Sequence, residues 1–364
     1  MYVIDENGLW DFCTVMITVV DHSGICTTDD LTGTIGGMVT SSATMEMEDV
    51  MIQLHGSGLT PQYTQGGSYA FQPMPFGGSY TVEPFLNDNP KQGVSTIDLI
   101  KIQKHLLGIE LLDSPYKIIA ADANRSGSIS AVDILELKKL ILGLIDELPH
   151  NTSWRFVDAG YDFTNALDPL QEAFPEDYVI DPFMTDMLDV DFIAVKVGDV
   201  NESSSQLGSG DPGEATSGRM EDIRLTMDDV VLTAGEEHEV VVSAEQLDET
   251  ATMQFTLSWD PAVMKVTEVI PGQRSRSKQW NKERLAEGVL PFSWHTLEVP
   301  GSGTDQLFTI RVKALQDLRL SQALDLNSSV TPEEGSRLDG TLSEIKLVFG
   351  DGAPVNESLI LYQN

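Results

Sequence analysis

The sequence predicts a mainly β protein with a small α insertion, in which tandem β-sandwich modules flank a duplicated loop-helix segment. Three observations carry this prediction. Short alternating apolar runs, separated by Gly and Ser turns, occupy residues 33–84 and 220–350 of the 364-residue chain. Between residues 87 and 148 the apolar period changes from two to that of a helix. Within that stretch STIDLIKIQKHLLGI (95–109) and SAVDILELKKLILGL (130–144) align residue for residue, which indicates an internal repeat.

We expect seven segments in order. They are a terminal strand of a β-domain (1–32), a small β-sandwich (33–86), the duplicated loop-helix module (87–148), a mixed segment packing on the preceding modules (149–202), a linker (203–218), a second β-sandwich (219–350) and a C-terminal tether (351–364). The chain opens into an alternating run at 13–20 without a basic or apolar leader, so we expect it to be a piece of a longer polypeptide. Cys13 and Cys26 could form a bridge, remain buried thiols, or pair outside this piece.

The second sandwich rests on a series of candidate strands in about 130 residues. These are HEVVVSAE, ATMQFTLSWD, VMKVTEV, VLPFSWH, LFTIRVKAL and EIKLVFG, and their spacing is typical of a sandwich or jelly roll.

The repeat predicts two helices of about three turns each. Each copy begins with a capping box, Ser95 to Asp98 and Ser130 to Asp133, and ends at a glycine, Gly108 or Gly143.

The loop before the second helix has the spacing of an EF-hand-type calcium site. Such a loop surrounds Ca²⁺ with oxygens from positions 1, 3, 5, 9 and 12 and the carbonyl of position 7, at about 2.3–2.6 Å. The corresponding residues are Asp122, Asn124, Ser126, Ser130, Asp133 and the Ser128 carbonyl, with Gly127 at the sharp turn. The alternative is a metal-free turn that only caps the helix.

The loop before the first helix is a degenerate copy. Its equivalents are Asn87, Asn89, Lys91, Gly93, Ser95 and Asp98, with Lys91 offering a backbone carbonyl and Pro90 inserted. We expect calcium here too, against a metal-free turn. A third fragment, GDVN at 198–201, opens in the same way, but no helical pattern follows it. We expect a turn into the linker there, with a ligand role as the alternative.

The paired loop-helix at 87–148 resembles a dockerin, the duplicated calcium module of cellulosome-type assemblies. Residues 220–350 are similar to a cohesin, the sandwich onto which dockerins dock, on the strength of LTAGEEHEVVVSAEQL, FTLSWDPAVMKV and LFTIRVKAL. Residues 33–84, on the strength of GSYAFQPMPFGGSYTVEP, resemble carboxypeptidase-regulatory or collagen-adhesin B-type sandwiches, and 1–20 resemble the end of an Ig-like or HYR-type repeat. The whole order, with its LYQN ending, resembles the C-terminal region of type IX-secreted surface proteins of Bacteroidota. The resemblance implies Ca²⁺ and an extracellular or cell-surface location.

The charge balance limits the partners. With 57 acidic and 22 basic residues the formal net charge is −35, which excludes nucleic acid and disfavours anionic membranes. No stretch approaches the roughly 20 apolar residues of a membrane span. The acidity favours solubility, neutralisation by divalent cations, or both.

The sequence favours a binding role over catalysis. The histidines occur singly (His22, His55, His105, His150, His238 and His295), and there is no metalloprotease, nucleophile-elbow or phosphate-loop motif. A paired-carboxylate glycosidase is the enzymatic alternative that the many acids leave open. We expect a non-catalytic, calcium-stabilised stalk or adhesive module, alternatively a docking module or a non-catalytic part of a carbohydrate-active enzyme. Its expected partners are proteins or further copies of itself in an extracellular assembly, with carbohydrate as a further candidate.

Overall fold

The computed structural model describes residues 2–4, 10–12, 31–206, 222–245, 247, 250–272, 279–298, 305–350 and 353–354. Within them the chain is mainly β with three α-helices, which confirms the predicted fold class. A short antiparallel pair, β1 (Tyr2–Ile4) and β2 (Trp10–Phe12), begins the chain. The predicted strand at 13–20, Cys13, Cys26, most of the linker and nearly all of the tether lie outside the described residues.

The first sandwich consists of two four-stranded sheets. One has the order β6 (Ser68–Pro75), β3 (Thr32–Ser41), β10 (Phe192–Lys196) and β8 (Trp154–Asp158), and only its β3–β10 pair is parallel. The other has the order β5 (Gln62–Tyr63), β4 (Met51–His55), β7 (Tyr80–Phe85) and β9 (Tyr178–Ile180). The segment 149–202, which we expected to be a mixed segment packing on the preceding modules, supplies strands to both sheets. Alternation alone does not reveal which strands pair across the intervening helices.

Three helices follow the first part of this sandwich: α1 (Thr96–Leu106), α2 (Pro115–Ala121) and α3 (Ala131–Ile141). The repeat predicts α1 and α3, and both begin and end as expected. The backbone N–H groups of Ser95 and Ser130 donate to the carboxylates three residues later, and the glycines that follow the helices are left-handed. Helix α2 is an addition that the repeat does not predict; its local signal is the N-cap Ser114 followed by Pro115.

The helices and the first sandwich form one body because β8 and β10 have a core on each face. Phe156, Phe192 and Ala194 point into the sandwich core. Val157 and Val195, from the alternate positions, join the core of the helices. Shifting either strand by one residue would exchange the two sets of side chains.

The second sandwich contains all six strands expected from the sequence. Its larger sheet has the order β15 (Met264–Pro271), β17 (Asp305–Ala314), β13 (Glu237–Glu245), β11 (Ile223–Met227), β22 (Ile345–Phe349) and β23 (Ala353–Pro354). Its smaller sheet has the order β16 (Val289–His295), β14 (Thr250–Trp259), β20 (Glu334–Arg337) and β21 (Leu342–Ser343), with β19 (Leu324–Asn327) also paired to β14. A separate pair joins β12 (Val231–Leu232) to β18 (Leu318–Arg319). Short 3₁₀ turns lie at Pro169–Gln171, Ser203–Gln206, Leu285–Glu287 and Leu320–Gln322.

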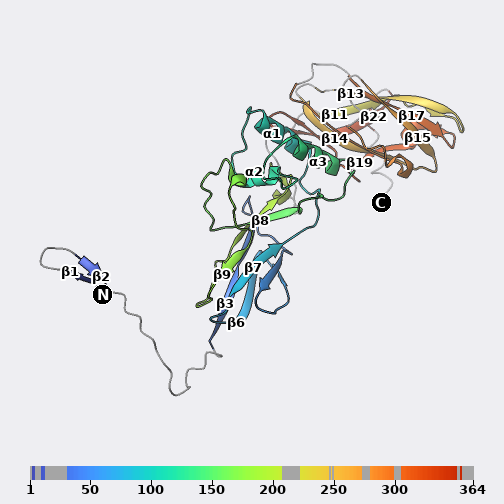
Figure 1. Cartoon of the computed structure of the whole chain (residues 1–364). Coiled ribbons are helices and arrows are strands. Elements are labelled where there is room, and N and C mark those ends of the chain that lie inside the picture. The colour runs from blue at the N-terminus through green and yellow to red at the C-terminus, as the bar shows by residue number, and fades with distance from the viewer. Residues whose placement is uncertain are drawn as a thin grey trace.

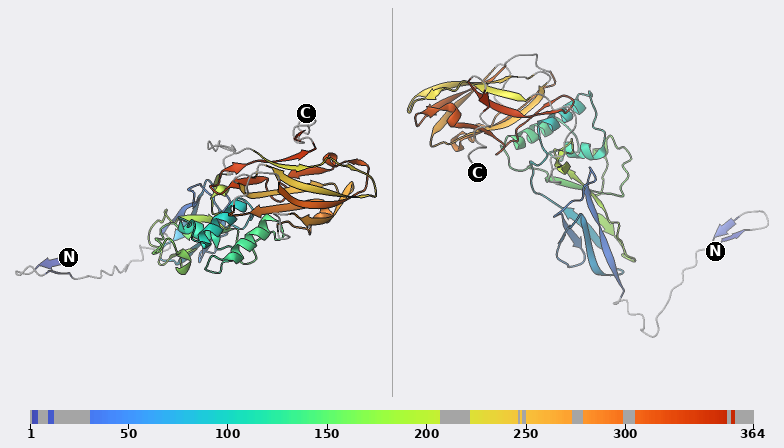
Figure 2. Two further views of the ribbon diagram at one scale, coloured as in Figure 1. Left: turned by 90° about the horizontal axis from the view of Figure 1, so that it is seen from above. Right: turned by 180° about the vertical axis from the view of Figure 1, so that it is seen from behind.

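The helices lie between the two sandwiches, so that α1 and α3 face the smaller sheet of the second one (Figures 1 and 2). Among the described residues, no helix is both long and apolar enough to span a membrane.

Candidate metal centre

The loop 122–133 connects the end of α2 to the start of α3. Helix α2 ends at Ala121, and Asp122 occupies its C-cap position. Ser130 caps α3, with its hydroxyl accepting from Val132 N at 3.2 Å. Two short helices therefore hold the first and last members of the predicted ligand set at the two ends of one loop.

Asp122 organises the first half of this loop. Its Oδ1 accepts from Ser126 N at 2.9 Å, and its Oδ2 accepts from Gly127 N at 2.8 Å. Asn124 Oδ1 also accepts from Ser126 N, at 3.1 Å. Gly127 has φ +76°, a conformation that costs an L-residue energy, so the glycine is needed for this turn.

Asp133 closes the second half of the loop. Its Oδ1 accepts from Asn124 N at 3.1 Å, and its Oδ2 accepts from Ser130 N at 2.8 Å. Asp122 and Asp133 are both buried. Ser126 Oγ donates to Ser128 O at 3.1 Å, which brings positions 5 and 7 together. The loop thus gathers all six of the predicted ligands.

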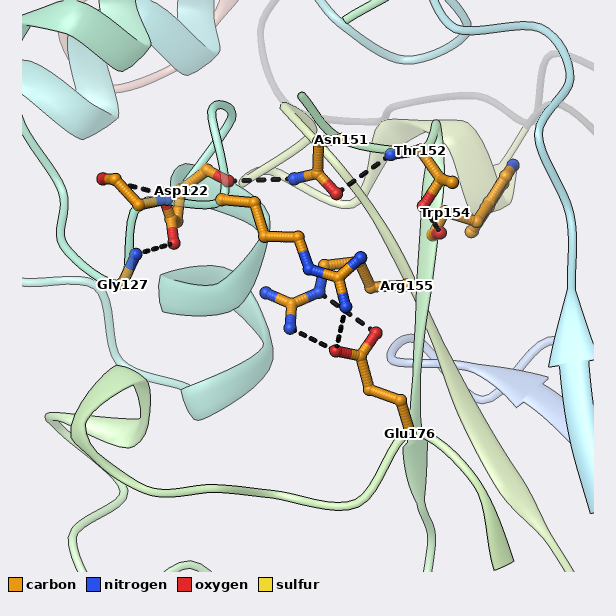
Figure 3. A network of polar contacts seen from close by, with 9 residues as sticks. Asp122, Gly127, Asn151, Thr152, Trp154, Arg155 and Glu176 are labelled. Atoms are coloured by element: carbon orange, nitrogen blue, oxygen red, sulfur yellow. Dashed lines mark hydrogen bonds and ion pairs between the residues drawn. The ribbon is translucent and has the colours of Figure 1, made fainter. Parts of the chain in front are cut away.

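The loop is anchored to the segments before and after strand β8 (Figure 3). Asn151 Nδ2 donates to Asp122 O at 3.1 Å. Arg125 of the loop and Arg155 of β8 share the carboxylate of Glu176, at 2.7 and 2.6 Å. Because Arg155 is buried, this pairing also neutralises an otherwise isolated charge.

The donor set of the loop fits Ca²⁺, which prefers several oxygen ligands of mixed type. Within the described part of the chain, no group of three or more His, Cys, Asp or Glu side chains is placed to hold a metal. The loop instead combines two carboxylates with amide, hydroxyl and carbonyl oxygens, a set suited to a hard cation and unlike the nitrogen and sulfur ligands of zinc.

The members of the first predicted loop are not all brought together. Asn87 Oδ1 accepts from Ser153 N at 2.8 Å, and Asn89 Nδ2 donates to Asp88 Oδ2 at 3.1 Å. The Lys91 carbonyl accepts from Val94 N in a turn. The three N-terminal members of the predicted set thus make other contacts.

Asp98 and Ser95 remain paired at the start of α1. Asp98 Oδ2 accepts from Ser95 N at 2.8 Å. Asp98 Oδ1, however, accepts from Val200 N and Asn201 N, at 2.9 and 3.1 Å. The GDVN fragment that we expected to be a turn into the linker therefore lies against α1.

Burial shifts the ionisation of the groups around Asp98. Burial, followed by repulsion from Asp199, raises the pKa of the Asp98 carboxyl well above its usual range. Burial also raises the pKa of Asp199 and lowers that of the Lys196 amine to about 8.

Buried carboxylate pairs with raised pKa values also occur in hydrolase active sites. The pair could act in this way only if a substrate could reach it. The cavity beside Asp199 has a volume of about 10 Å³, room for about one water molecule. Asp98 is 0% exposed and Asp199 is 3% exposed. This pair is closed to a sugar substrate.

A second feature of the helices is a face covered by the second sandwich. Thr96 N and Thr96 Oγ1 both donate to Gln254 Oε1 of β14, at 2.9 and 3.0 Å. At the end of α3, Thr331 Oγ1 donates to Ile141 O at 2.9 Å. Asn281 Nδ2 donates to Leu142 O and to the carbonyl of the next residue, both at 3.1 Å. The second sandwich therefore contacts the first turn of α1 and satisfies carbonyls at the end of α3.

Apolar residues complete this face. Ile97, Ile100 and Leu142 are buried but belong to none of the three hydrophobic cores that the described residues form, which indicates that they are covered from outside the helical core. Of the apolar side chains at the ends of the two helices, Ile141 and Leu142 are buried, whereas Leu106 and Leu107 are exposed.

Comparison with known proteins gives one family match. Residues 89–142 match the dockerin type I domain. No curated protein matches the chain. Among solved structures, the chain is similar to a type I cohesin–dockerin complex of Clostridium thermocellum, with 16% identity, 35% of this chain and 94% of that chain covered, and a TM-score of 0.28.

Two further solved structures are cohesins. A non-cellulosomal cohesin of Archaeoglobus fulgidus has 15% identity, 39% and 99% coverage of this chain and of that one, and a TM-score of 0.28. The cohesin CaCohA2 of Clostridium acetobutylicum has 13% identity, 37% and 95% coverage, and a TM-score of 0.27. These likenesses concern the fold alone.

Proposed function

We propose that this chain is a non-catalytic, calcium-stabilised structural unit whose dockerin-like helices dock in cis onto the chain's own second sandwich. The observation that carries the proposal is the burial of the polar face of β14. This strand alternates, with Met253, Phe255 and Leu257 in the sandwich core. The residues between them, Thr252, Gln254 and Thr256, are polar and yet fully buried.

A strand with one polar face normally shows that face to water. Burying polar groups is tolerated only where they are hydrogen-bonded. Gln254 Oε1 meets this requirement through Thr96 of α1, and Thr256 bonds to Thr331, whose hydroxyl in turn reaches α3. The composition of the covered face is therefore that of a built interface between the helices and the sandwich.

Calcium is proposed to hold the helical module together. The ligands at the loop 122–133 would be those predicted from the sequence: Asp122, Asn124, Ser126, the Ser128 carbonyl, Ser130 and Asp133. When bound, the ion supplies positive charge between two buried carboxylates. Binding to the native state alone would stabilise the module by mass action.

The parent protein is proposed to be secreted or displayed at the cell surface, where millimolar calcium suits loops of this type. The dockerin type I match supports this location, because such modules serve in extracellular assemblies. The wider resemblance to type IX-secreted proteins of Bacteroidota remains a prediction of the sequence.

Docking to a separate protein is the second candidate, and one observation favours it. Leu106, Leu107, Ile109 and Leu111, at the end of α1 and beyond it, are all exposed. A run of four large apolar side chains on one exposed segment is a candidate contact for a partner protein.

Hydrogen exchange of the whole chain would test docking in cis. The first turn of α1 and strand β14 should be protected to the same degree at every protein concentration, with the chain monomeric by light scattering. Rapid exchange of the α1 first turn, or protection that grows with concentration, would contradict cis docking. The second candidate would gain if Leu107→Ser and Ile109→Ser abolished binding to a partner without changing this protection.

A further inference from the structure

The first turn of α1 is completed by a segment that lies about one hundred residues downstream. Residues 199–204 follow β10, and the 3₁₀ turn Ser203–Gln206 begins within them. Their backbone N–H groups at Val200 and Asn201 donate to Asp98 Oδ1. The structure thus places residues 199–204, which resemble the first half of a calcium loop, beside the segment ending at Asp98, which resembles the second half.

The joined segments reproduce the hydrogen bonds of the loop 122–133. Asp199 Oδ1 accepts from Ser203 N at 3.0 Å and Asp199 Oδ2 accepts from Ser204 N at 2.8 Å, as Asp122 accepts from Ser126 and Gly127. Asn201 Oδ1 accepts from Ser203 N at 3.1 Å, as Asn124 accepts from Ser126.

The closing half of the loop corresponds as well. Asn201 N donates to Asp98 Oδ1 at 3.1 Å, which is the distance from Asn124 N to Asp133 Oδ1. Ser95 N donates to Asp98 Oδ2 at 2.8 Å, which is the distance from Ser130 N to Asp133 Oδ2.

The contact across the junction also has its counterpart. Ser203 Oγ donates to Gly93 O at 3.0 Å, as Ser126 Oγ donates to Ser128 O at 3.1 Å. Gly93 therefore occupies position 7 of the loop, and its carbonyl points to the same place as that of Ser128. The chain break of the joined loop falls between positions 6 and 7.

The backbone and the packing agree with this correspondence. Glu202 has φ +60° and Arg125 has φ +54°, so both fourth positions are left-handed. Val200 and Ala123, at the second positions, are buried in the same core. A shared backbone conformation at a non-glycine position is uncommon and strengthens the equivalence.

Gly93 is the residue that lets the two segments meet. A Cβ atom at this position would lie 2.6 Å from Asp199 Oδ2 and 2.8 Å from Ser204 N. Its φ of +75° also favours glycine.

The joined loop buries two carboxylates with no cation of the described residues in ion-pair contact. Among the described residues, neither Asp98 nor Asp199 forms an ion pair within 4.0 Å. Lys196 lies nearby, but its Nζ donates to Pro90 O and Ser153 O and lies 5.7 Å from the Trp154 ring. Unpaired buried charge is costly, so a bound cation would remove a large penalty.

A third carboxyl group lies beside these two. Glu334 of β20 receives a hydrogen bond from the Ser95 side chain. Its Oε1 is buried with no partner among the described residues. The negative charge at the start of α1 therefore extends to the interface with the second sandwich.

We propose that these two segments form a split calcium site, the first of the pair that the repeat implies. Its oxygens would come from Asp199, Asn201, Ser203, the Gly93 carbonyl, Ser95 and Asp98. Asn87, Asn89 and Lys91 take no part. The inference rests on the calcium role proposed above and extends it, because this site ties the end of β10 to the start of α1.

Calcium stoichiometry measured on the whole chain tests the split site. Native mass spectrometry and isothermal titration with CaCl₂ should give two ions per wild-type chain and one for Asp199→Asn. Asp122→Asn should also bind one ion, and the double variant none. The matched control Asn89→Gly removes the side chain that a contiguous first loop would use, while keeping its left-handed backbone; it should still bind two.

Each outcome has a distinct meaning. One ion in the wild type, lost in Asp122→Asn and kept in Asp199→Asn, would overturn the split site while leaving the calcium role intact. No ion in the wild type would overturn the calcium role itself. Loss of an ion in Asn89→Gly but not in Asp199→Asn would restore the contiguous loop.

A milder variant keeps the test valid if Asp199→Asn does not fold. Asn201→Ala removes one neutral ligand and should weaken one of the two sites at least about 10-fold, the loss that even an outer-shell partner typically causes. Circular dichroism would verify folding. Two unchanged affinities in a folded Asn201→Ala chain would overturn the proposal.

Discussion

The contact between α1 and β14 can be tested by removing one acceptor. Gln254 is 0% exposed, and its Oε1 receives both the N–H and the hydroxyl of Thr96, which is also fully buried. Gln254→Met keeps the size of the side chain but removes the acceptor, so both donors of Thr96 lose their partner.

The expected cost follows from counting these groups. Leaving two buried donors unpaired costs about 2–4 kcal/mol. Gln254 Nε2 has no partner among the described residues, so removing it returns about 1 kcal/mol. We therefore expect Gln254→Met to lower the free energy of unfolding by about 2 kcal/mol.

A double-mutant cycle separates the contact from other effects of the substitution. Thr96→Val alone should cost about 1 kcal/mol, because it removes one hydrogen bond. In the Gln254→Met background the same change should cost nothing, because it removes an unpaired hydroxyl. Urea unfolding followed by tryptophan fluorescence should therefore give a coupling of about 1 kcal/mol. Equal costs of Thr96→Val in both backgrounds would refute the contact between helix and sandwich.

Three further predictions concern calcium, an ion pair and pH. EDTA should lower the Tm of the chain, and replacing Asp122 and Asp133 by Ala should remove most of the stabilisation that calcium adds through the loop 122–133, as calorimetry would show. Glu176→Gln should cost about 3 kcal/mol in chemical unfolding, because it leaves the guanidinium of Arg155 buried without its partner. Burial, followed by the charge of a nearby lysine, lowers the pKa of His295 to about 4, so its contribution to stability should fall by at most about 3 kcal/mol as the pH drops from 6.5 to 4.

The sign of the pH effect follows from proton binding. The unfolded chain protonates His295 near pH 6.5, whereas the folded chain does so only near pH 4, so the unfolded state holds more protons between these values. His295→Gln should therefore have a shallower loss of stability in this window than the wild type. Identical pH profiles of the wild type and His295→Gln would contradict the assignment of this pH effect to His295. An unchanged calcium-induced shift in Tm in the Asp122 and Asp133 variants would contradict the site in the loop 122–133. An unchanged free energy of unfolding in Glu176→Gln would contradict the role of its ion pair.

Local patterns in the sequence were sufficient for part of the fold. Alternating runs located six strands of the second sandwich, β13 to β17 and β22, and the repeat located α1 and α3 with their caps. These features depend on the period of the backbone and on hydrogen bonds between neighbours within four residues. Helix α2 carries the local signal Ser114-Pro115, but it is short and lies outside the repeat.

The first metal site was predicted as a contiguous loop, whereas the structure places the partners of Asp98 at residues 200 and 201. The fragment Asp199-Val-Asn201-Glu-Ser203 has the same D-x-N-x-S pattern as Asp122-Ala-Asn124-Arg-Ser126. This pattern can be read in the sequence, but no helical pattern follows it, so it does not predict a calcium loop by itself. The helix exists earlier in the chain, as α1.

The sequence by itself determined the conformation of the loop 122–133. All of the oxygens predicted to bind calcium there lie within twelve consecutive residues, and the two flanking helices orient them. Only the tertiary structure decided where Asp98 finds its partners and what covers the polar face of β14. Both answers join residues that lie more than one hundred positions apart. Such pairings are set by how the β10 strand and the second sandwich pack against the helices, and no local pattern records that packing.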